Sequence, residues 1–243
     1  MDAIESLFFN LLRDHQIMLK EVQLKQFNMY FEELISWNNK MNLTGITERE
    51  QVYIKHFFDS LTISFYVPFL QVEFFADIGS GAGFPSIPLK ILFPHLKVMI
   101  VDSLSKRIHF LNHLLDVLKL SDVNCIHGRA EDIARIPLYR NKFDLVTARA
   151  VAKLNVLNEL CLPYVKVGGK FVAMKGTNPE SEINESSFSL HELRSEISQI
   201  ESFQLPTDHS YRHLVIIKKL GTTSSKYPRK AGIPMKEPLI LNL

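Results

Sequence analysis

The sequence predicts an α/β fold, in which a mostly parallel sheet is preceded by a helical segment. Two observations support this prediction. From residue 72 onward, short apolar runs alternate with longer helical ones, as in parallel strands joined by crossover helices. A glycine-rich turn at 79–83 follows the first strand, at the place where open parallel sheets bind ligands. We expect a helical segment at 1–65, the sheet domain at 66–220 and a basic extended tail at 221–243.

Composition is that of an ordinary globular protein and excludes several other classes. A net charge of +2 is too small to indicate a nucleic-acid partner by itself. Cys125 and Cys161 are the only cysteines; both lie in apolar runs, which indicates buried reduced thiols. Asp2 and Glu5 stand where a signal peptide would carry positive charge, and the longest uncharged apolar run, 60–72, is too short to span a bilayer. We therefore expect a cytoplasmic protein without a membrane segment.

The first 65 residues are predicted to be mainly helical. Residues 21–38 carry apolar side chains at the spacing of one face of a helix. These side chains are Leu24, Phe27, Phe31, Leu34 and Ile35. The stretches 4–19 and 47–65 show helical patterns as well.

Five parallel strands are expected next, followed by an antiparallel pair. The predicted parallel strands are 72–78, 97–103, 123–128, 143–148 and 170–176. The predicted helices between and after them are 88–93, 106–120, 154–165 and 180–198. The strands are apolar almost throughout, which indicates burial on both faces. SFQL (202–205) and RHLVIIKKL (212–220), joined by a short turn-rich segment, indicate the antiparallel pair.

The glycine turn does not fit the common phosphate-binding motifs. Phe84 occupies the last position of the dinucleotide fingerprint, and the lysine of a Walker motif is absent. The pattern is instead an acid, Asp77, followed by Gly79, Gly81 and Gly83. An acid in the site disfavours a pyrophosphate but suits the ammonium and sulfonium groups of S-adenosylmethionine. A plain tight turn is the alternative, because glycine also serves turns that bind nothing.

Acids at the ends of the next two strands favour an adenosyl site. Asp102 ends the second strand, about 20 residues past the glycines, where such sheets place a carboxylate on the ribose hydroxyls. Glu131 and Asp132 follow the third strand, where an adenine would lie. Any one of these acids could be a helix cap or a solvated charge. Together they predict S-adenosylmethionine as the cofactor.

The methyl acceptor is suggested mainly by motifs that are missing. Residues 147–152 (TARAVA) follow the fourth strand without the N-P-P-Y motif that exocyclic amine methylation favours. Neither Cys125 nor Cys161 has the exposed setting of an activated thiol. Arg149 is the remaining charged group at the rim of the site, the edge formed by the carboxyl ends of the parallel strands. Its alternative role is purely structural, as the partner of one of the acids at this rim in an ion pair. A ring nitrogen such as guanine N7, which loses no proton on methylation, fits this inventory.

The tail supplies a predicted contact surface for RNA. Residues 218–236 hold six basic residues and no acid. A basic, flexible segment with an aromatic residue is typical of a phosphate-binding arm, although a solvated terminus has the same composition. The predicted RNA-binding residues are Lys226, Tyr227, Arg229, Lys230 and Lys236. No metal site is expected, because His109, His113 and Asp116 share a helix face that we interpret as solvated.

Several motifs in order give the chain a family resemblance. They are WNNKMNLTGI, HFFDSL, DIGSGAGFPSIPLKI, VDSLSKRIHFLN, GRAED, TARAVA and KYPRKAGIPMKEPL. From about residue 20 to its end, the chain resembles the bacterial 16S rRNA guanine-N7 methyltransferases, once called glucose-inhibited division protein B. The resemblance implies a Rossmann-like class I S-adenosylmethionine-dependent methyltransferase fold. It implies methyl transfer to N7 of one guanine in a 16S rRNA loop near the decoding region.

The resemblance also implies roles for individual residues. Gly79 and Phe84 would lie against the cofactor, Ala130 and Glu131 would hold its adenine end, and Arg149 would sit at its reactive end. The acceptor would be 16S rRNA or a small-subunit precursor, and we expect a monomer. Three other classes stay open from the residues alone: a small-molecule methyltransferase, a non-catalytic rRNA-binding assembly factor and, with least support, a nicotinamide enzyme.

Overall fold

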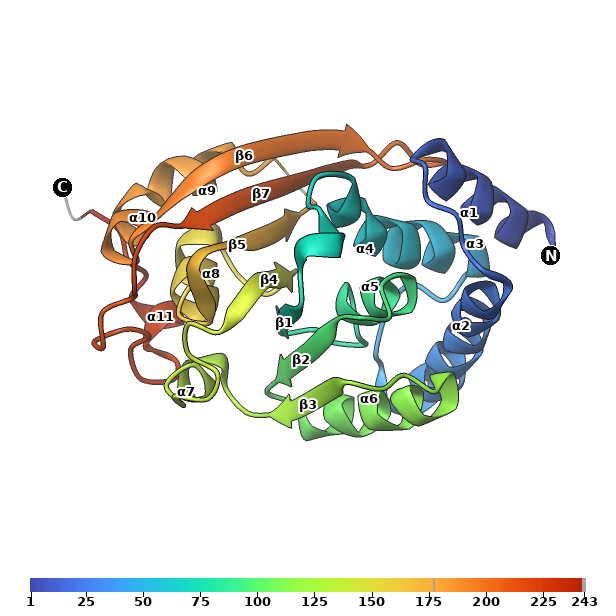
Figure 1. The fold of residues 1–243 in the computed structure, drawn as a ribbon, viewed down its shortest axis with the longest axis horizontal. Helices are drawn as coiled ribbons and strands as arrows, with labels where there is room; N and C mark the ends of the chain where they lie inside the picture. Colours follow the sequence, from blue (N-terminus) through green and yellow to red (C-terminus); the bar gives the residue numbers. More distant parts are fainter. Residues whose placement is uncertain (177, 242–243) are drawn as a thin grey trace.

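The computed structural model, which describes residues 1–176 and 178–241, contains one seven-stranded sheet (Figure 1). The strands are β1 (Phe74–Ile78), β2 (Lys97–Asp102), β3 (Val123–His127), β4 (Phe143–Arg149), β5 (Val165–Lys175), β6 (Ser195–Gln204) and β7 (Tyr211–Lys219). They lie in the order β3-β2-β1-β4-β5-β7-β6. The first five strands are parallel, and β7 pairs antiparallel with both β5 and β6. The predicted fold class is confirmed.

Strand order reverses between β1 and β4, which pair through Phe75–Leu145 and Asp77–Thr147. At such a point the loops that follow the two strands diverge to opposite faces and leave a crevice. The glycine turn follows β1 and Arg149 ends β4, so both lie at this crevice.

Helices cover both faces of the sheet (Figure 1). The α-helices are α1 (Ala3–Asp14), α2 (Glu21–Met41), α3 (Arg49–Val52), α4 (Asp59–Leu61), α5 (Ser86–Leu92), α6 (Ser105–Leu118), α7 (Ala130–Ile133), α8 (Leu154–Cys161), α9 (Glu180–Glu185), α10 (Ser187–Glu192) and α11 (Ile233–Lys236). A π-helical segment, η1 (Tyr53–Phe58), joins α3 to α4, and 3₁₀ turns follow at η2 (Thr62–Phe65) and η3 (Phe69–Gln71). Among the described residues, no helix is long and apolar enough to cross a membrane.

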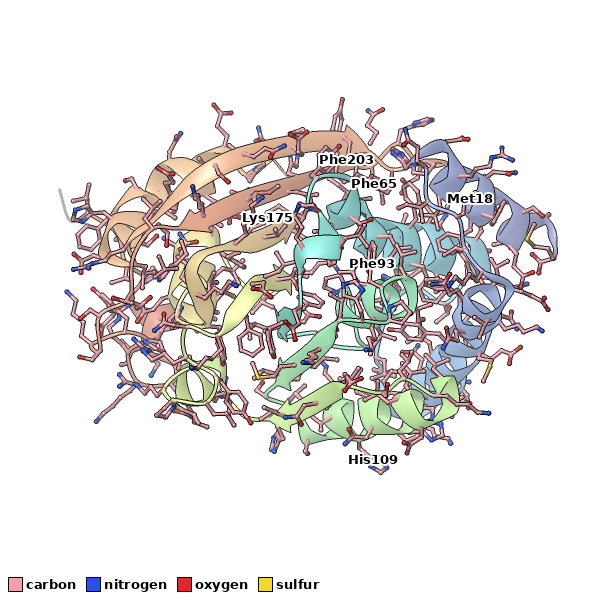
Figure 2. All side chains as sticks on the ribbon, in the orientation of Figure 1. Met18, Phe65, Phe93, His109, Lys175 and Phe203 are labelled. Carbon is pink, nitrogen blue, oxygen red and sulfur yellow. The ribbon has the colours of Figure 1, made fainter. Side chains whose placement is uncertain are left out.

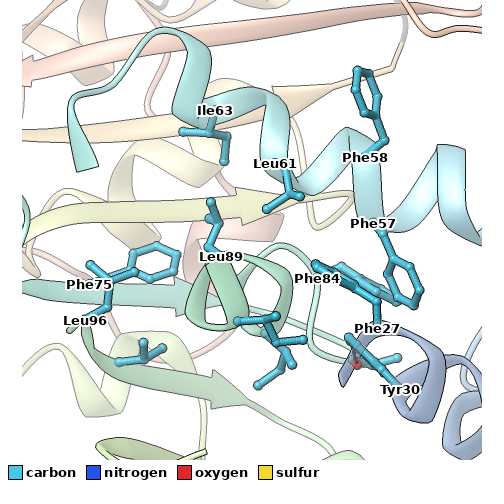
Figure 3. Packing of buried hydrophobic residues seen from close by; sticks show 14 of the residues in the cluster. Phe27, Tyr30, Phe57, Phe58, Leu61, Ile63, Phe75, Phe84, Leu89 and Leu96 are labelled. Atoms are coloured by element: carbon cyan, nitrogen blue, oxygen red, sulfur yellow. Dashed lines mark hydrogen bonds between the residues drawn. The ribbon is translucent and has the colours of Figure 1, made fainter. Parts of the chain in front are cut away.

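The N-terminal helices share a hydrophobic core with the sheet. Phe27 and Phe57 are fully buried in the same cluster as Phe75 of β1 and Phe84, which follows the glycine turn. Figure 3 shows Phe27, Tyr30, Phe57 and Phe84 gathered where α2 and η1 meet the turn. The helical segment therefore forms one wall beside the crevice. A second cluster, on the opposite face, is formed with α8, α10 and the tail.

The predicted helix over 180–198 is wrong at its end. α10 ends at Glu192, Arg194 adopts a left-handed conformation with φ +52°, and β6 begins at Ser195. β6 is an edge strand whose residues are polar along most of its length, so it lacks the apolar alternation that identifies a half-buried strand. Pairing with β7 decides its conformation instead.

Residues 221–241 of the tail are mostly irregular and are packed against the domain. Arg135 Nη2 donates to the Pro228 carbonyl at 2.5 Å, and Tyr227 is only 5% exposed. The tail also contains the short helix α11, which the sequence analysis did not predict. Leu239 is buried in the α8 cluster.

Candidate cofactor and acceptor site

The three glycines of the turn have different surroundings. All three have positive φ, at +75° for Gly79, +63° for Gly81 and +101° for Gly83. A side chain at Gly83 would lie 2.8 Å from the Tyr30 hydroxyl, which donates to the Ala82 carbonyl at 2.6 Å. A side chain at Gly81 would meet nothing within 4 Å. Gly83 is therefore required by internal packing, whereas Gly81 borders open space that a ligand can approach.

Asp77 lies beneath the turn and not in the open crevice. Its side chain is fully buried and accepts hydrogen bonds from the Ser86 amide at 3.2 Å and the Thr147 hydroxyl at 3.0 Å. These bonds tie the start of α5 to β1 and β4. Burial raises the pKa of Asp77 to about 6. The structure gives Asp77 a role in bracing the turn, in place of the direct contact with an ammonium that the sequence suggested.

Asp102 connects the second strand to the turn. Its Oδ2 accepts from the Gly81 amide at 3.0 Å and from Arg107 at 3.2 Å, and its Oδ1 accepts from the Leu104 amide at 2.9 Å. A carboxylate has about four acceptor positions, so this one retains capacity for a ribose hydroxyl. The predicted position of Asp102 beside the turn is what the structure shows.

Ala130 and Glu131 begin α7 at the end of the third strand, as expected. The Ala130 carbonyl accepts from the Tyr164 hydroxyl at 2.6 Å. Glu131 is 5% exposed, and its Oε1 accepts from the Gly232 amide of the tail at 2.8 Å. The adenine side of the predicted site is therefore fastened to the tail.

Phe84 and Arg149 form a stack at the other side of the turn. The Phe84 ring is 5% exposed and stacks on His56 with a centroid separation of 4.5 Å. The Arg149 guanidinium lies over the same ring at 5.0 Å. Burial, with Arg149 next in effect, lowers the pKa of His56 to about 3, so this imidazole is neutral at physiological pH. Its Nδ1 then donates to the Lys55 carbonyl, which leaves Nε2 to accept from Thr44.

Arg149 pairs with an acid that the sequence analysis did not identify. Its Nη1 donates to Asp59 Oδ2 at 3.0 Å, and Arg212 Nε lies 3.4 Å from Asp59 Oδ1. Asp59 is 3% exposed; burial raises its pKa while the two guanidinium groups oppose that shift. One buried carboxylate thus fixes two arginines that come from β4 and β7.

A cavity of about 460 Å³ opens beside this group. Its apolar walls include Met174 and Leu214, and its charged lining is Lys55, Asp59, Arg149, Lys175, Glu182 and Arg212. Lys175 ends β5 (Figure 2). The volume is within the range of small-ligand pockets, and Arg149 lies between the cavity and Phe84 of the turn. A cofactor at the turn and a second reactant in the cavity would meet at Arg149.

Comparison with known proteins decides the family. The model of the GidB family, described as rRNA small subunit methyltransferase G, matches residues 23–215. The proteins named ribosomal RNA small subunit methyltransferase G in Bacillus cytotoxicus and Bacillus mycoides are each 54% identical over 232 residues, which is 96% of this chain and 97% of theirs. The chain belongs to the rRNA small subunit methyltransferase G family.

The methyltransferase fold is also found in solved structures of more distant proteins. An O-methyltransferase from Bacillus cereus in complex with SAH has a TM-score of 0.55 at 15% identity and covers 78% of this chain and 91% of that one. The predicted family, fold class and methyltransferase activity are confirmed, and the cofactor of the family is S-adenosylmethionine. The open space at Gly81 and the rim carboxylates Asp102 and Glu131 fit that cofactor.

The side chains that could supply a nucleophilic thiol or a metal site are either buried or too far from one another. Burial raises the pKa of the Cys125 thiol to about 12, and Cys161 is fully buried with a raised pKa as well. Within residues 1–176 and 178–241, no three metal-ligating side chains lie close enough together to hold an ion. The helix face of His109 and His113 is only partly solvated, which corrects our interpretation. His109 points away from the body (Figure 2), whereas His113 contacts Glu33 at 2.7 Å.

The structure separates the tail residues into two groups. Tyr227 donates from its hydroxyl to Glu192 at 2.8 Å, and Lys226 Nζ donates to the same carboxylate at 2.7 Å. Arg229 binds Glu159, whose side chain is 1% exposed. Lys230 and Lys236 are exposed. The first three residues attach the tail to the domain, and the last two carry charge into solvent.

Proposed function

We propose that this methyltransferase transfers the methyl group of S-adenosylmethionine to N7 of one guanine in 16S ribosomal RNA, in line and without a general base. The observation that carries the proposal is the charged cavity beside Arg149, at the crevice between β1 and β4. Family membership supports ribosomal RNA as the substrate. The position of the cavity supports a base inserted next to the methyl donor.

Guanine N7 suits the side chains of the cavity. N7 has an in-plane lone pair and no proton, so the protein has to hold it near the methyl carbon, about 3 Å away and collinear with sulfur. His56 is neutral, but its Nε2 is engaged with Thr44, and His213 Nδ1 is engaged with Ser202 at 2.8 Å. Neither cysteine is activated. This arrangement supports a reaction that needs positioning and no proton transfer.

Arg149 is proposed to orient the reactants. Guanidinium does not deprotonate at working pH, so it cannot serve as a base. Asp59 and the Phe84 ring hold it from two sides. Its remaining N–H groups can donate to the carboxylate of the cofactor or to an acceptor atom of the base.

The RNA is proposed to reach the site across the tail. Lys230 and Lys236 extend from the segment that contains Gly232, which is bonded to the adenine-side acid Glu131. Phosphate contacts by these lysines would place RNA beside the cofactor rim. We propose that Lys226, Tyr227 and Arg229 assist by holding the tail, and that the protein works as a monomer in the cytoplasm.

Methylation of a defined RNA tests this function. The RNA would carry guanine or 7-deazaguanine at the target, presented as free 16S rRNA and as assembling small subunits. We expect methyl transfer to the guanine RNA, and binding without transfer to the 7-deaza RNA. Transfer to 7-deazaguanine would refute N7 as the acceptor. Transfer to small molecules alone would support a small-molecule methyltransferase, and RNA binding without any transfer would support an assembly factor.

A further inference from the structure

The cavity contains one carboxylate that the chemistry above does not use. Glu182, on α9, lines the cavity together with Arg149 and Lys175. Its Oε2 accepts from the Leu154 amide at 2.7 Å and from Lys175 Nζ at 2.6 Å. Its Oε1 accepts no hydrogen bond from the described part of the chain, and the side chain is 21% exposed. Glu182 therefore lines the cavity with a carboxylate that is fixed through Oε2 and retains the acceptor capacity of Oε1.

An acceptor in this place matches one edge of guanine. The Watson–Crick edge of guanine presents two neighbouring donors, N1–H and the N2 amino group. In guanine, that edge adjoins the N7 edge at O6, and N1–H and the N2 amino group lie beyond O6 and do not point in the direction of the N7 lone pair. A guanine whose N7 faces the methyl donor therefore directs both donors away from the cofactor, into the rest of the cavity. Oε1 of a carboxylate has about two acceptor positions and can accept from N1–H and from the N2 amino group, whereas adenine offers an acceptor at N1.

We propose that Glu182 recognises the Watson–Crick edge of the target guanine and thereby determines base specificity. This inference rests on the proposed function, because it places a guanine in the cavity with N7 toward the cofactor. Glu182 is a specificity residue and takes no proton. Lys175 and the Leu154 amide hold its carboxylate in position.

The same contact would favour the reaction as well as binding. Methylation at N7 makes the purine cationic and its N1–H a stronger donor. A hydrogen bond from N1–H to a carboxylate therefore strengthens as charge develops on the ring. An interaction that is stronger in the transition state than in the ground state raises kcat and does not only lower KM.

Inosine at the target position separates this role from a structural one. Inosine retains N7 and N1–H and lacks the N2 amino group. A hydrogen bond to a charged group corresponds to about a 10- to 100-fold effect, so we expect wild-type kcat/KM to fall by about that factor on inosine RNA. In Glu182→Gln, guanine RNA should react more slowly, and the guanine-to-inosine ratio should fall toward one.

Glu185→Gln is the matched control. Glu185 lies on the same helix, is exposed, and pairs with Lys153 at 3.6 Å. This variant should keep the wild-type ratio. Should Glu182→Gln be inactive, the ratio of the two RNA affinities, measured by fluorescence anisotropy, gives the same comparison without turnover.

An unchanged guanine-to-inosine ratio in Glu182→Gln would overturn the inference, and so would a wild-type protein that methylates both RNAs equally. Both results leave N7 methylation intact. Absence of N7 methylation by the wild-type protein would instead refute the proposed function, so the two failures are distinguishable.

Discussion

Arg229→Met should destabilise the whole domain, although Arg229 lies in the tail. Arg229 donates to Glu159 from its backbone amide at 2.7 Å, from Nε at 3.0 Å and from Nη2 at 2.7 Å. Glu159 lies on α8 within the second hydrophobic cluster and is fully buried. Replacement by methionine keeps most of the side-chain volume and removes the charge, so one backbone bond is left to a buried carboxylate.

The expected loss of unfolding free energy follows from leaving the Glu159 carboxylate without its charged partner. Removing one partner of a buried ion pair costs about 3–5 kcal/mol, a large part of the 5–15 kcal/mol by which domains are stable. Urea unfolding followed by the fluorescence of Trp37, the single tryptophan, measures the free energy directly. Trp37 lies on α2, far along the chain from the tail, so its signal reports global unfolding.

Two controls separate the buried charge from other effects. Lys230→Met changes an exposed neighbour and should alter stability by less than about 0.5 kcal/mol. The double variant Glu159→Leu/Arg229→Met removes both charges and should recover most of the loss, because apolar replacement of a buried pair is often neutral. An Arg229→Met protein within about 1 kcal/mol of wild type would refute the reasoning.

Two further predictions concern the turn and the tail. Asp77 has a folded pKa of about 6 against an ordinary 3.8, so its contribution to stability is present below pH 4 and is lost as pH rises through 6. Between pH 4 and pH 7, the free energy of unfolding of Asp77→Asn should therefore rise by about 2.4 kcal/mol relative to that of wild type, as measured by urea titrations. A difference that does not change with pH would disprove the raised pKa of Asp77. Lys230→Met and Lys236→Met should each lower the slope of log RNA affinity against log salt by about 0.7–0.9 at unchanged melting temperature. Slopes equal to that of wild type would remove the tail from the RNA surface.

The positions of the proposed cofactor-binding acids are predictable because they follow from chain order. Parallel strands bring their carboxyl ends to one edge, so acids at the ends of successive strands must lie together. This reasoning predicts the positions of Asp102 and Glu131, which the structure places beside the glycine turn and in α7. Asp77 ends its strand too, but side chains alternate between the two faces of a sheet, and its carboxylate is buried beneath the turn. Chain order therefore predicts at which edge of the sheet a residue lies, but it does not predict the direction in which its side chain points.

The cavity beside Arg149 could not be predicted, because its charged residues come from distant elements. Asp59 and Arg149 are 90 residues apart, and their contact depends on how η1 and α4 pack against the sheet. One signal was available. Asp59 stands within the apolar run HFFDSL, and Glu159 within LNVLNELC. An acid inside an apolar helical run must be paired when buried, so such acids predict a partner even though the sequence does not identify it.

The hydrogen bond from the Gly232 amide to Glu131 makes the tail part of the proposed cofactor site. Thermodynamic linkage then requires reciprocity: the factor by which a docked tail changes cofactor affinity is the factor by which the cofactor changes tail docking. Deleting residues 222–243 would consequently remove the hydrogen-bond donors of Glu131 and Glu159 as well as the lysines of the tail. Any effect of this truncation on RNA binding would therefore combine the loss of the Glu131 contact, the loss of the Glu159 contact and the loss of the lysines. Single lysine substitutions are the changes that isolate the contribution of RNA contacts.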